Sequence, residues 1–360
     1  MMNSRLQNLS FLAAMILGAA GGLMPQTAAG EVQVEQSGAA TVGPFEFHSG
    51  FWINLHHFLY QQALQNAEGP PVPNALMNAP QLSAAEQSQW GQAVAFYRQS
   101  MIEHDLLSDP GMNAIDTVLG HAEGSASLDS SGLKDDLVKV LEEAAPIYLA
   151  HWWSGHDRAN RFWIRTVTPM VLALGPALAK QLSTAYHVPW LAQPIRVDVA
   201  VYANWAGAYT YTSDHVHTII SSVDPSYQDF AALEMLFHEA SHGMVSEKSG
   251  HIADQIAREC KSDGIPVPQD LVHVMIFFTA GEFARRDLAS VGVAHYQPYA
   301  IKNSLYPRSG WTRYASALDL FWIPHLDGKA PLDVSIVEVI DALAVGQSAA
   351  VAPPETGSKN

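Results

Sequence analysis

The stretch FAALEMLFHEASH, residues 230–242, decides how the rest of the chain is interpreted. Apolar residues recur in it every three or four positions, the period of a helix that packs one face against a core. On such a helix His238 and His242 lie one turn apart, so their imidazoles project from the same face and can bind one metal ion. Glu239 is offset from His238 by about 100° and can accept a proton from a water molecule that the ion activates. The stretch therefore predicts a core helix that carries a metal site.

The helix is expected to extend beyond this stretch, over residues 226–247. Its start can be capped in two ways: by Asp224 with Pro225 at the first helical position, or by Ser226 with Asp229 three residues later. The HExxH spacing also arises by chance, in on the order of a few chains per hundred of this histidine content. Two imidazoles and a carboxylate beside an apolar stripe need partners, however, because buried polar groups without partners are costly. A metal ion supplies those partners, and this favours the metal site.

A zinc site needs a third protein ligand and leaves a fourth position for water or substrate. The segment QDLVHVMIFFTAGEFARRDL, residues 269–288, predicts a second apolar helix that contains Glu282. A carboxylate among apolar neighbours is costly unless it is paired or binds a metal. We therefore assign Glu282 as the third ligand of one zinc ion per chain. The alternative for Glu282 is an ion pair with Arg285 or Arg286 at helical spacing.

Two histidines are rivals of Glu282 for the third position. His273 precedes Glu282 by nine residues, about 900° along a straight helix, so the two side chains face opposite ways and cannot both bind the ion. His295 follows the predicted helix. The sequence leaves the choice among the three residues open, with Glu282 as the preferred ligand.

Strands are predicted upstream of the HExxH helix. Alternating apolar and polar residues indicate a strand over 195–202, and short turns separate it from strands over 208–212 and 215–222. We interpret these three strands as a small antiparallel sheet. The first half of the chain and the segments after the motif have helical periodicity. The predicted fold class is thus α+β and mainly α.

An HExxH helix that follows a small antiparallel sheet and precedes a helix with a glutamate resembles the gluzincin-type zinc metallopeptidases of the zincin superfamily, over about residues 195–290. The resemblance implies that the strand 215–222 is an edge strand that pairs with an extended substrate. No narrower family is assigned, because the 40 residues from His242 to Glu282 exceed the short spacing of thermolysin-like members. The metzincin extension after His242 is absent as well.

The expected organisation follows from these assignments. It comprises a signal peptide (1–30), a flexible leader (31–44), a helical region (45–190), a zincin-like metal-binding catalytic region (191–345) and a flexible tail (346–360).

Amide hydrolysis also needs a group that stabilises negative charge on the reacting carbonyl oxygen, usually a Tyr, His or Arg. The segment HYQPY, residues 295–299, follows the second helix closely. We assign Tyr296 to this role, with Tyr299 and Tyr306 as alternates. An aromatic turn at the surface explains the same segment without any catalytic role.

Composition narrows the classes of function. The formal net charge of −16 disfavours nucleic-acid binding, because an acidic protein repels phosphate backbones. Sixteen His against a single Cys exclude a disulfide scaffold and a cysteine-based zinc finger. His richness alone locates no site, and His56 and His57, for example, are better explained as ordinary helix residues. The apolar run from Leu9 to Met24 is short for a membrane span and indicates a secretory signal.

These features together predict an exported protein, periplasmic or secreted, with no stable membrane span after signal cleavage. The expected activity is zinc-dependent hydrolysis of a peptide or protein substrate, with Glu239 as general base and acid. Two alternatives remain: an exported zinc-binding protein without catalytic activity, and a zinc hydrolase that acts on a non-peptide bond.

Overall fold

The computed structural model describes residues 39–65, 81–213, 215–246 and 248–351, with side chains as far as residue 345. The expected signal peptide and most of the expected leader lie outside the described residues. The helices lie at α2 (Phe51–Gln65), α3 (Ala84–Ser100), α4 (Pro110–His121), α5 (Asp135–Tyr148), η2 (Leu149–Trp153), α6 (Ser154–Tyr186), η3 (Pro225–Tyr227), α7 (Phe230–His242), α8 (His251–Asp263), α9 (Leu271–Ser290), α10 (Tyr299–Lys302), α11 (Leu305–Arg308), α12 (Thr312–Ala317), η4 (Leu318–Trp322), α13 (Ile323–Leu326) and α14 (Leu332–Val351). The strands are β1 (Ala40–Val42), β2 (Phe45–His48), β3 (Ile195–Ala200), β4 (Ala208–Tyr211) and β5 (His217–Ser221).

The fold is α+β and mainly α, which confirms the predicted class, but the sheet is mixed rather than antiparallel. Its strand order is β1-β2-β3-β5-β4. β2 pairs with β3 and β3 with β5 in parallel, whereas the two outer pairs are antiparallel. The predicted antiparallel sheet of three strands is therefore wrong, because β3 pairs with β5 in parallel. The alternating pattern located the three strands, but it could not give their pairing, because parallel pairing joins segments that are not neighbours in the sequence.

β1 and β2 come from residues 40–48, which the sequence analysis divided between a flexible leader and a helical region. β2 pairs with β3 from Phe45↔Ile195 to His48↔Asp198. The sheet thus takes strands from both sides of the expected boundary near residue 190. At the other end of the chain, α14 continues through Val351, into the segment expected to be a flexible tail.

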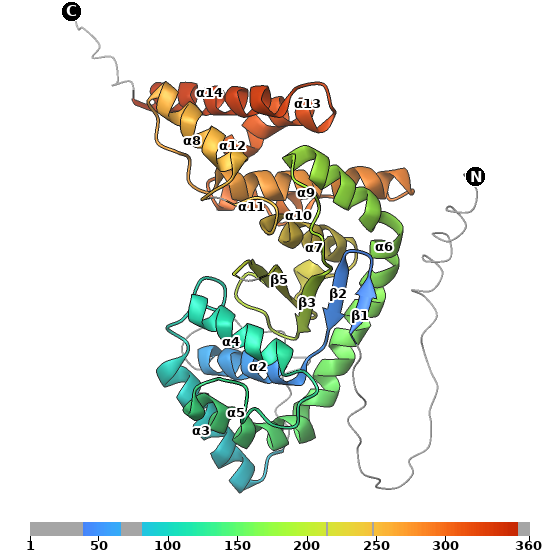
Figure 1. Ribbon diagram of the computed structural model, residues 1–360, viewed down its shortest axis with the longest axis vertical. Helices are drawn as coiled ribbons and strands as arrows, with labels where there is room; N and C mark the ends of the chain where they lie inside the picture. Colours follow the sequence, from blue (N-terminus) through green and yellow to red (C-terminus); the bar gives the residue numbers. More distant parts are fainter. Residues whose placement is uncertain (1–38, 66–80, 214, 247, 352–360) are drawn as a thin grey trace, which may run out of the picture.

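The sheet lies between two helical groups, one on each face (Figure 1). The face toward α2, α3, α4 and α5 contributes Tyr209, Tyr211 and Ile219 to one apolar core. The opposite face contributes Val197 and Ile220 to a second core, which is shared with α7, α9 and the C-terminal helices. The HExxH helix α7 therefore rests on one side of the sheet and the N-terminal helices rest on the other.

α5, η2 and α6 form one continuous helix, Asp135–Tyr186, that runs beside both groups (Figure 1). It is the one helix in the described ranges that is long and apolar enough, by length and composition, to cross a membrane. Its buried residues Leu141 and Tyr148 belong to the first core, and Val167 and Leu178 belong to the second. The helix therefore contributes side chains to both cores.

Candidate metal centre

The start of α7 is set by residues on its N-terminal side. Asp224 caps a short 3-10 helix by accepting a hydrogen bond from the Ser226 N–H at 2.7 Å. Asp229 then adopts a positive φ of 54°, and α7 begins at Phe230. Asp224 thus caps this separate short helix rather than α7, and α7 is shorter than the predicted helix over 226–247. It ends at His242, so the second histidine of the motif occupies the last turn.

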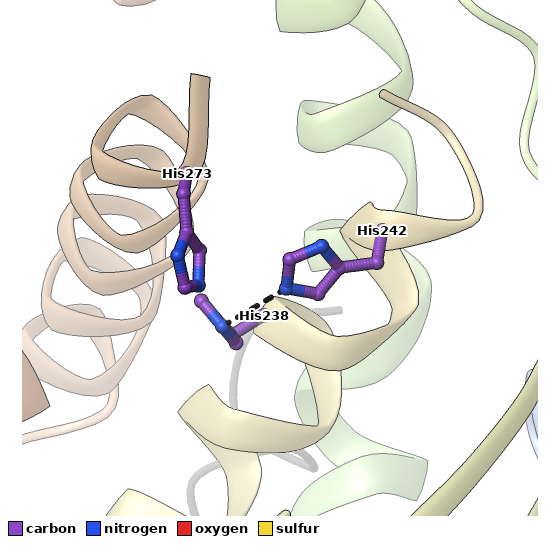
Figure 2. A group of neighbouring side chains, drawn as sticks. All are labelled: His238, His242 and His273. Carbon is purple, nitrogen blue, oxygen red and sulfur yellow. Dashed lines mark hydrogen bonds between the residues drawn. The ribbon is translucent and has the colours of Figure 1, made fainter. Parts of the chain in front are cut away.

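Three imidazoles converge beside this last turn (Figure 2). His238 and His242 come from α7 and His273 comes from α9, and their ligand nitrogens all lie within 4.8 Å of one another. The Nε2 atoms of His238 and His242 are 3.3 Å apart. Two nitrogens at about 2.0–2.1 Å from one tetrahedral ion would be separated by roughly this distance. The donor set therefore fits a zinc-type ion.

Burial keeps these imidazoles in the neutral form that binds metals. His238 is buried, and desolvation together with the neighbouring His242 and His273 holds its pKa well below the usual range. The pKa of His242 is lowered to about 3 by burial and by His273, and burial also lowers the pKa of His273. The Nδ1 atom of His238 is buried and has no hydrogen-bond partner among the described residues. His242 and His273 are only half-buried, so the group has one side toward solvent.

Glu239 lies on α7 between the two motif histidines, where the sheet approaches the helix. The Thr210 hydroxyl of β4 donates to Glu239 Oε2 at 2.8 Å and lies 2.8 Å from the Thr218 hydroxyl of β5. Glu239 is only 4% exposed, and desolvation raises its pKa to about 8. The carboxylate is therefore held by the sheet rather than by a cation. Thr210 was not identified from the sequence, where it is one residue of a predicted strand.

Glu282 does not belong to this group, and its assignment as third ligand is wrong on this geometry. Its carboxylate accepts hydrogen bonds from Arg285 at 2.7 and 2.8 Å and from Arg286 at 2.6 Å. These are the ion pairs that the sequence analysis kept as the alternative. His273, nine residues earlier on the same helix, faces α7 instead, as the half-turn offset requires. His295 is exposed and is likewise not part of the group.

Tyr296 is engaged elsewhere, which contradicts its assignment as the stabilising group. Its hydroxyl donates to Glu234 Oε2 at 2.6 Å. Glu234 also accepts the Tyr299 N–H, at 2.9 and 3.0 Å from its two oxygens. This carboxylate is completely buried. The Tyr296 proton is thus committed to a buried carboxylate one turn before His238.

The alternate Tyr299 lies against residues of the metal centre. Its ring stacks on Phe277 with centroids 6.0 Å apart, and Phe277 packs against His238 at 3.8 Å. Its ring also lies 5.4 Å from that of Tyr227. Burial raises the pKa of Tyr299, so its hydroxyl keeps its proton and remains a donor.

The edge strand of the sheet next to the site is β4, not the segment 215–222. β5 pairs with both β3 and β4 and is therefore interior, which corrects the expectation drawn from the resemblance. The Ser221 N–H donates to the Gly207 C=O at 2.8 Å. Because hydrogen-bonded pairs alternate along an antiparallel ladder, the backbone groups of Ala208 and Thr210 point away from β5. They line the edge next to Glu239.

Comparison of this chain with known proteins gives no match to a protein-family model, to a curated protein or to a solved structure.

Proposed function

We propose that this protein is a metal-dependent hydrolase of peptide bonds, with zinc held by His238, His242 and His273. The observation that carries the proposal is the convergence of three neutral imidazoles beside a carboxylate that the sheet holds in place. Zinc bound to three protein ligands lowers the pKa of a water molecule and polarises a carbonyl group. Catalytic sites keep such a fourth position open, and the exposure of His242 and His273 supports one here.

Glu239 is the proton-transfer group of this proposal. Its Oε2 atom accepts the hydrogen bond from Thr210, which fixes the carboxylate and leaves Oε1 to take a proton from the attacking water. The same carboxylate then returns the proton to the leaving amine. A general base of this kind must lie within hydrogen-bond reach of the proton that it accepts, and its position one residue after His238 is consistent with that requirement.

The peptide-bond assignment rests on β4. An extended peptide can add to a sheet edge through main-chain hydrogen bonds, and the backbone groups of Ala208 and Thr210 are available for this pairing. Thr210 therefore has two functions: its backbone aligns the substrate and its hydroxyl aligns Glu239. A hydrolase of a non-peptide bond would have no use for this edge, so the edge supports the peptide-bond alternative.

The test compares wild type with Glu239→Gln and with Glu338→Gln, a control that makes the same chemical change at an exposed helix position. Each protein is analysed for bound metal and assayed with a broad peptide library and a panel of ester and phosphoester substrates. We expect Glu239→Gln to keep its metal and to lose about 10²–10⁴-fold in peptide hydrolysis, because the general base is lost. Glu338→Gln should match wild type in both measurements.

Three outcomes would contradict the proposal. Full peptide hydrolysis by Glu239→Gln would remove Glu239 as the base. Hydrolysis of esters or phosphoesters without peptide cleavage would favour the non-peptide hydrolase. A metal-loaded wild type that hydrolyses none of these substrates would favour the non-catalytic zinc-binding protein.

A further inference from the structure

A second group of metal-ligand type lies on the opposite face of the sheet, in the core formed with the N-terminal helices. His56 and His57 of α2 and Asp116 of α4 place their ligand atoms within 4.8 Å of one another. All three residues have no measurable exposure. Asp116 has no Lys or Arg partner among the described residues, so its charge must be balanced from within this group.

The hydrogen bonds of His57 leave a lone pair directed at Asp116. Its Nδ1 atom lies 2.8 Å from the Tyr202 carbonyl oxygen, which only accepts, so Nδ1 carries the ring proton. The Nε2 atom lies 3.0 Å from Asp116 Oδ1. In the neutral ring this contact brings two acceptors together, and a cation between them resolves the conflict. The bond from Nδ1 to a carbonyl is also the usual outer contact of a histidine that binds a metal.

The surroundings of His56 indicate that this cation is a metal ion and not a proton. Its Nδ1 atom lies 2.7 Å from the Tyr97 hydroxyl, while its Nε2 atom is buried and has no hydrogen-bond partner among the described residues. Nε2 points to the same oxygen, Asp116 Oδ1, at 3.9 Å. A proton shared by His57 and Asp116 would leave this nitrogen unsatisfied, whereas one metal ion satisfies both imidazoles and the carboxylate.

A fourth donor comes from the sheet. The Tyr209 hydroxyl on β4 lies 2.5 Å from Asp116 Oδ2 and 3.4 Å from His57 Nε2. Ligand atoms at about 2.0–2.2 Å from one ion are separated by roughly 3–3.5 Å, so a small movement of His56 completes the set. Two imidazoles with a carboxylate suit a divalent first-row transition metal, and the Tyr209 hydroxyl donates to the carboxylate from the side of the sheet.

We infer that His56, His57 and Asp116, with Tyr209, form a closed structural site for a divalent transition metal of the zinc type. Its burial distinguishes it from the half-exposed centre on α7, because structural sites are closed and catalytic sites keep an open position. The ion would fix α2 and α4 to β4 at Tyr209. The residue after Tyr209, Thr210, holds Glu239 on the other face of the sheet. The site does not depend on the proposed hydrolase activity.

The test uses the full chain, produced in zinc-supplemented medium and analysed for metal per chain. His242→Ala removes a ligand of the α7 centre and isolates the second site, so we expect one ion per chain in this background. Addition of Asp116→Asn, which keeps the shape of the side chain, should reduce the content to none. His56→Phe in the same background should also give none.

His156→Phe is the matched control. Like His56, His156 is a buried histidine of this region, and its Nδ1 atom lies 2.8 Å from the hydroxyl of a buried tyrosine, Tyr148. In the His242→Ala background it should retain the one ion. Circular dichroism checks that each variant is folded. If Asp116→Asn does not fold, the comparison of His56→Phe with His156→Phe tests the second site instead. A folded His242→Ala protein without metal would overturn the inference. So would an ion that survives Asp116→Asn or His56→Phe, or an equal loss in His156→Phe.

Discussion

At the residue scale, Glu234 is a buried carboxylate whose environment disfavours its charged form. It has no exposure, and desolvation raises its pKa from 4.5 to about 7, although hydrogen bonds from Tyr296 and the Tyr299 backbone oppose this shift. A group whose pKa is higher in the folded protein than in the unfolded chain binds its proton more tightly when folded. Its contribution to stability is complete below pH 4.5 and is lost as the pH rises through about 7.

Substitution of Glu234 by Gln should remove this pH dependence. One pKa unit corresponds to about 1.4 kcal/mol, so the rise from 4.5 to about 7 corresponds to about 3 kcal/mol of unfolding free energy lost between acid and alkaline pH. Relative to wild type, Glu234→Gln should gain about that amount between pH 4.5 and pH 8.5. Denaturant titrations of both proteins at the two pH values measure this difference. A difference between the two proteins that stays constant with pH would show that Glu234 does not titrate in this way.

The sequence could identify the motif residues but could not choose the third imidazole. His238, Glu239 and His242 follow from helical spacing alone, because all three lie on one element. His273 and Glu282 lie on opposite faces of another helix that is apolar nearly all round, so periodicity does not reveal which face meets α7. Two arginines within four residues of Glu282 were the local signal for its ion pairs. They satisfy the carboxylate without a metal ion.

At the scale of elements, the close approach of α9 to its neighbours depends on Gly281. A Cβ atom at this position would lie 2.8 Å from Pro298 Cβ and 3.1 Å from Glu234 Oε1. Gly155 in α6 offers a contrast, because a Cβ atom there would meet no atom within 4 Å.

Gly281→Ala should therefore destabilise the protein by about 1–3 kcal/mol, the usual cost of overpacking a close contact. Gly155→Ala should instead stabilise it by about 0.5–1 kcal/mol, since alanine is the better helix former and no neighbour is displaced. Thermal or denaturant unfolding of the two variants measures both effects. Stabilisation by both substitutions would show that α9 does not pack as tightly as described.

The sheet contains strands that the sequence could predict and strands that it could not. The three strands after residue 190 were expected because alternation is local, and the capping box of Ser83 and Glu86 at the start of α3 is a local feature of the same kind. β1 and β2 are only three and four residues long, so their periodicity is too short to separate them from a leader. The parallel pairing of β2 with β3 joins residues about 150 positions apart in the sequence, and no local pattern carries that information.

At the scale of the whole molecule, the sheet separates two helical groups and carries a polar centre on each face. Tyr209 and Thr210 are neighbours on β4 and point to opposite faces, as the strand period requires. Tyr209 contacts the buried His57–Asp116 pair, and Thr210 contacts Glu239. The fold class was predictable from composition and periodicity, but this two-sided arrangement depends on tertiary packing that the sequence pattern does not specify.

The most direct test of the α7 centre is the metal content of His273→Ala and Glu282→Ala, purified side by side with wild type. Both substitutions remove a polar side chain from α9, but only His273 belongs to the imidazole group. We predict that His273→Ala holds one ion per chain fewer than wild type and that Glu282→Ala holds the wild-type number. Loss of the ion from Glu282→Ala with full retention in His273→Ala would contradict the three-histidine centre.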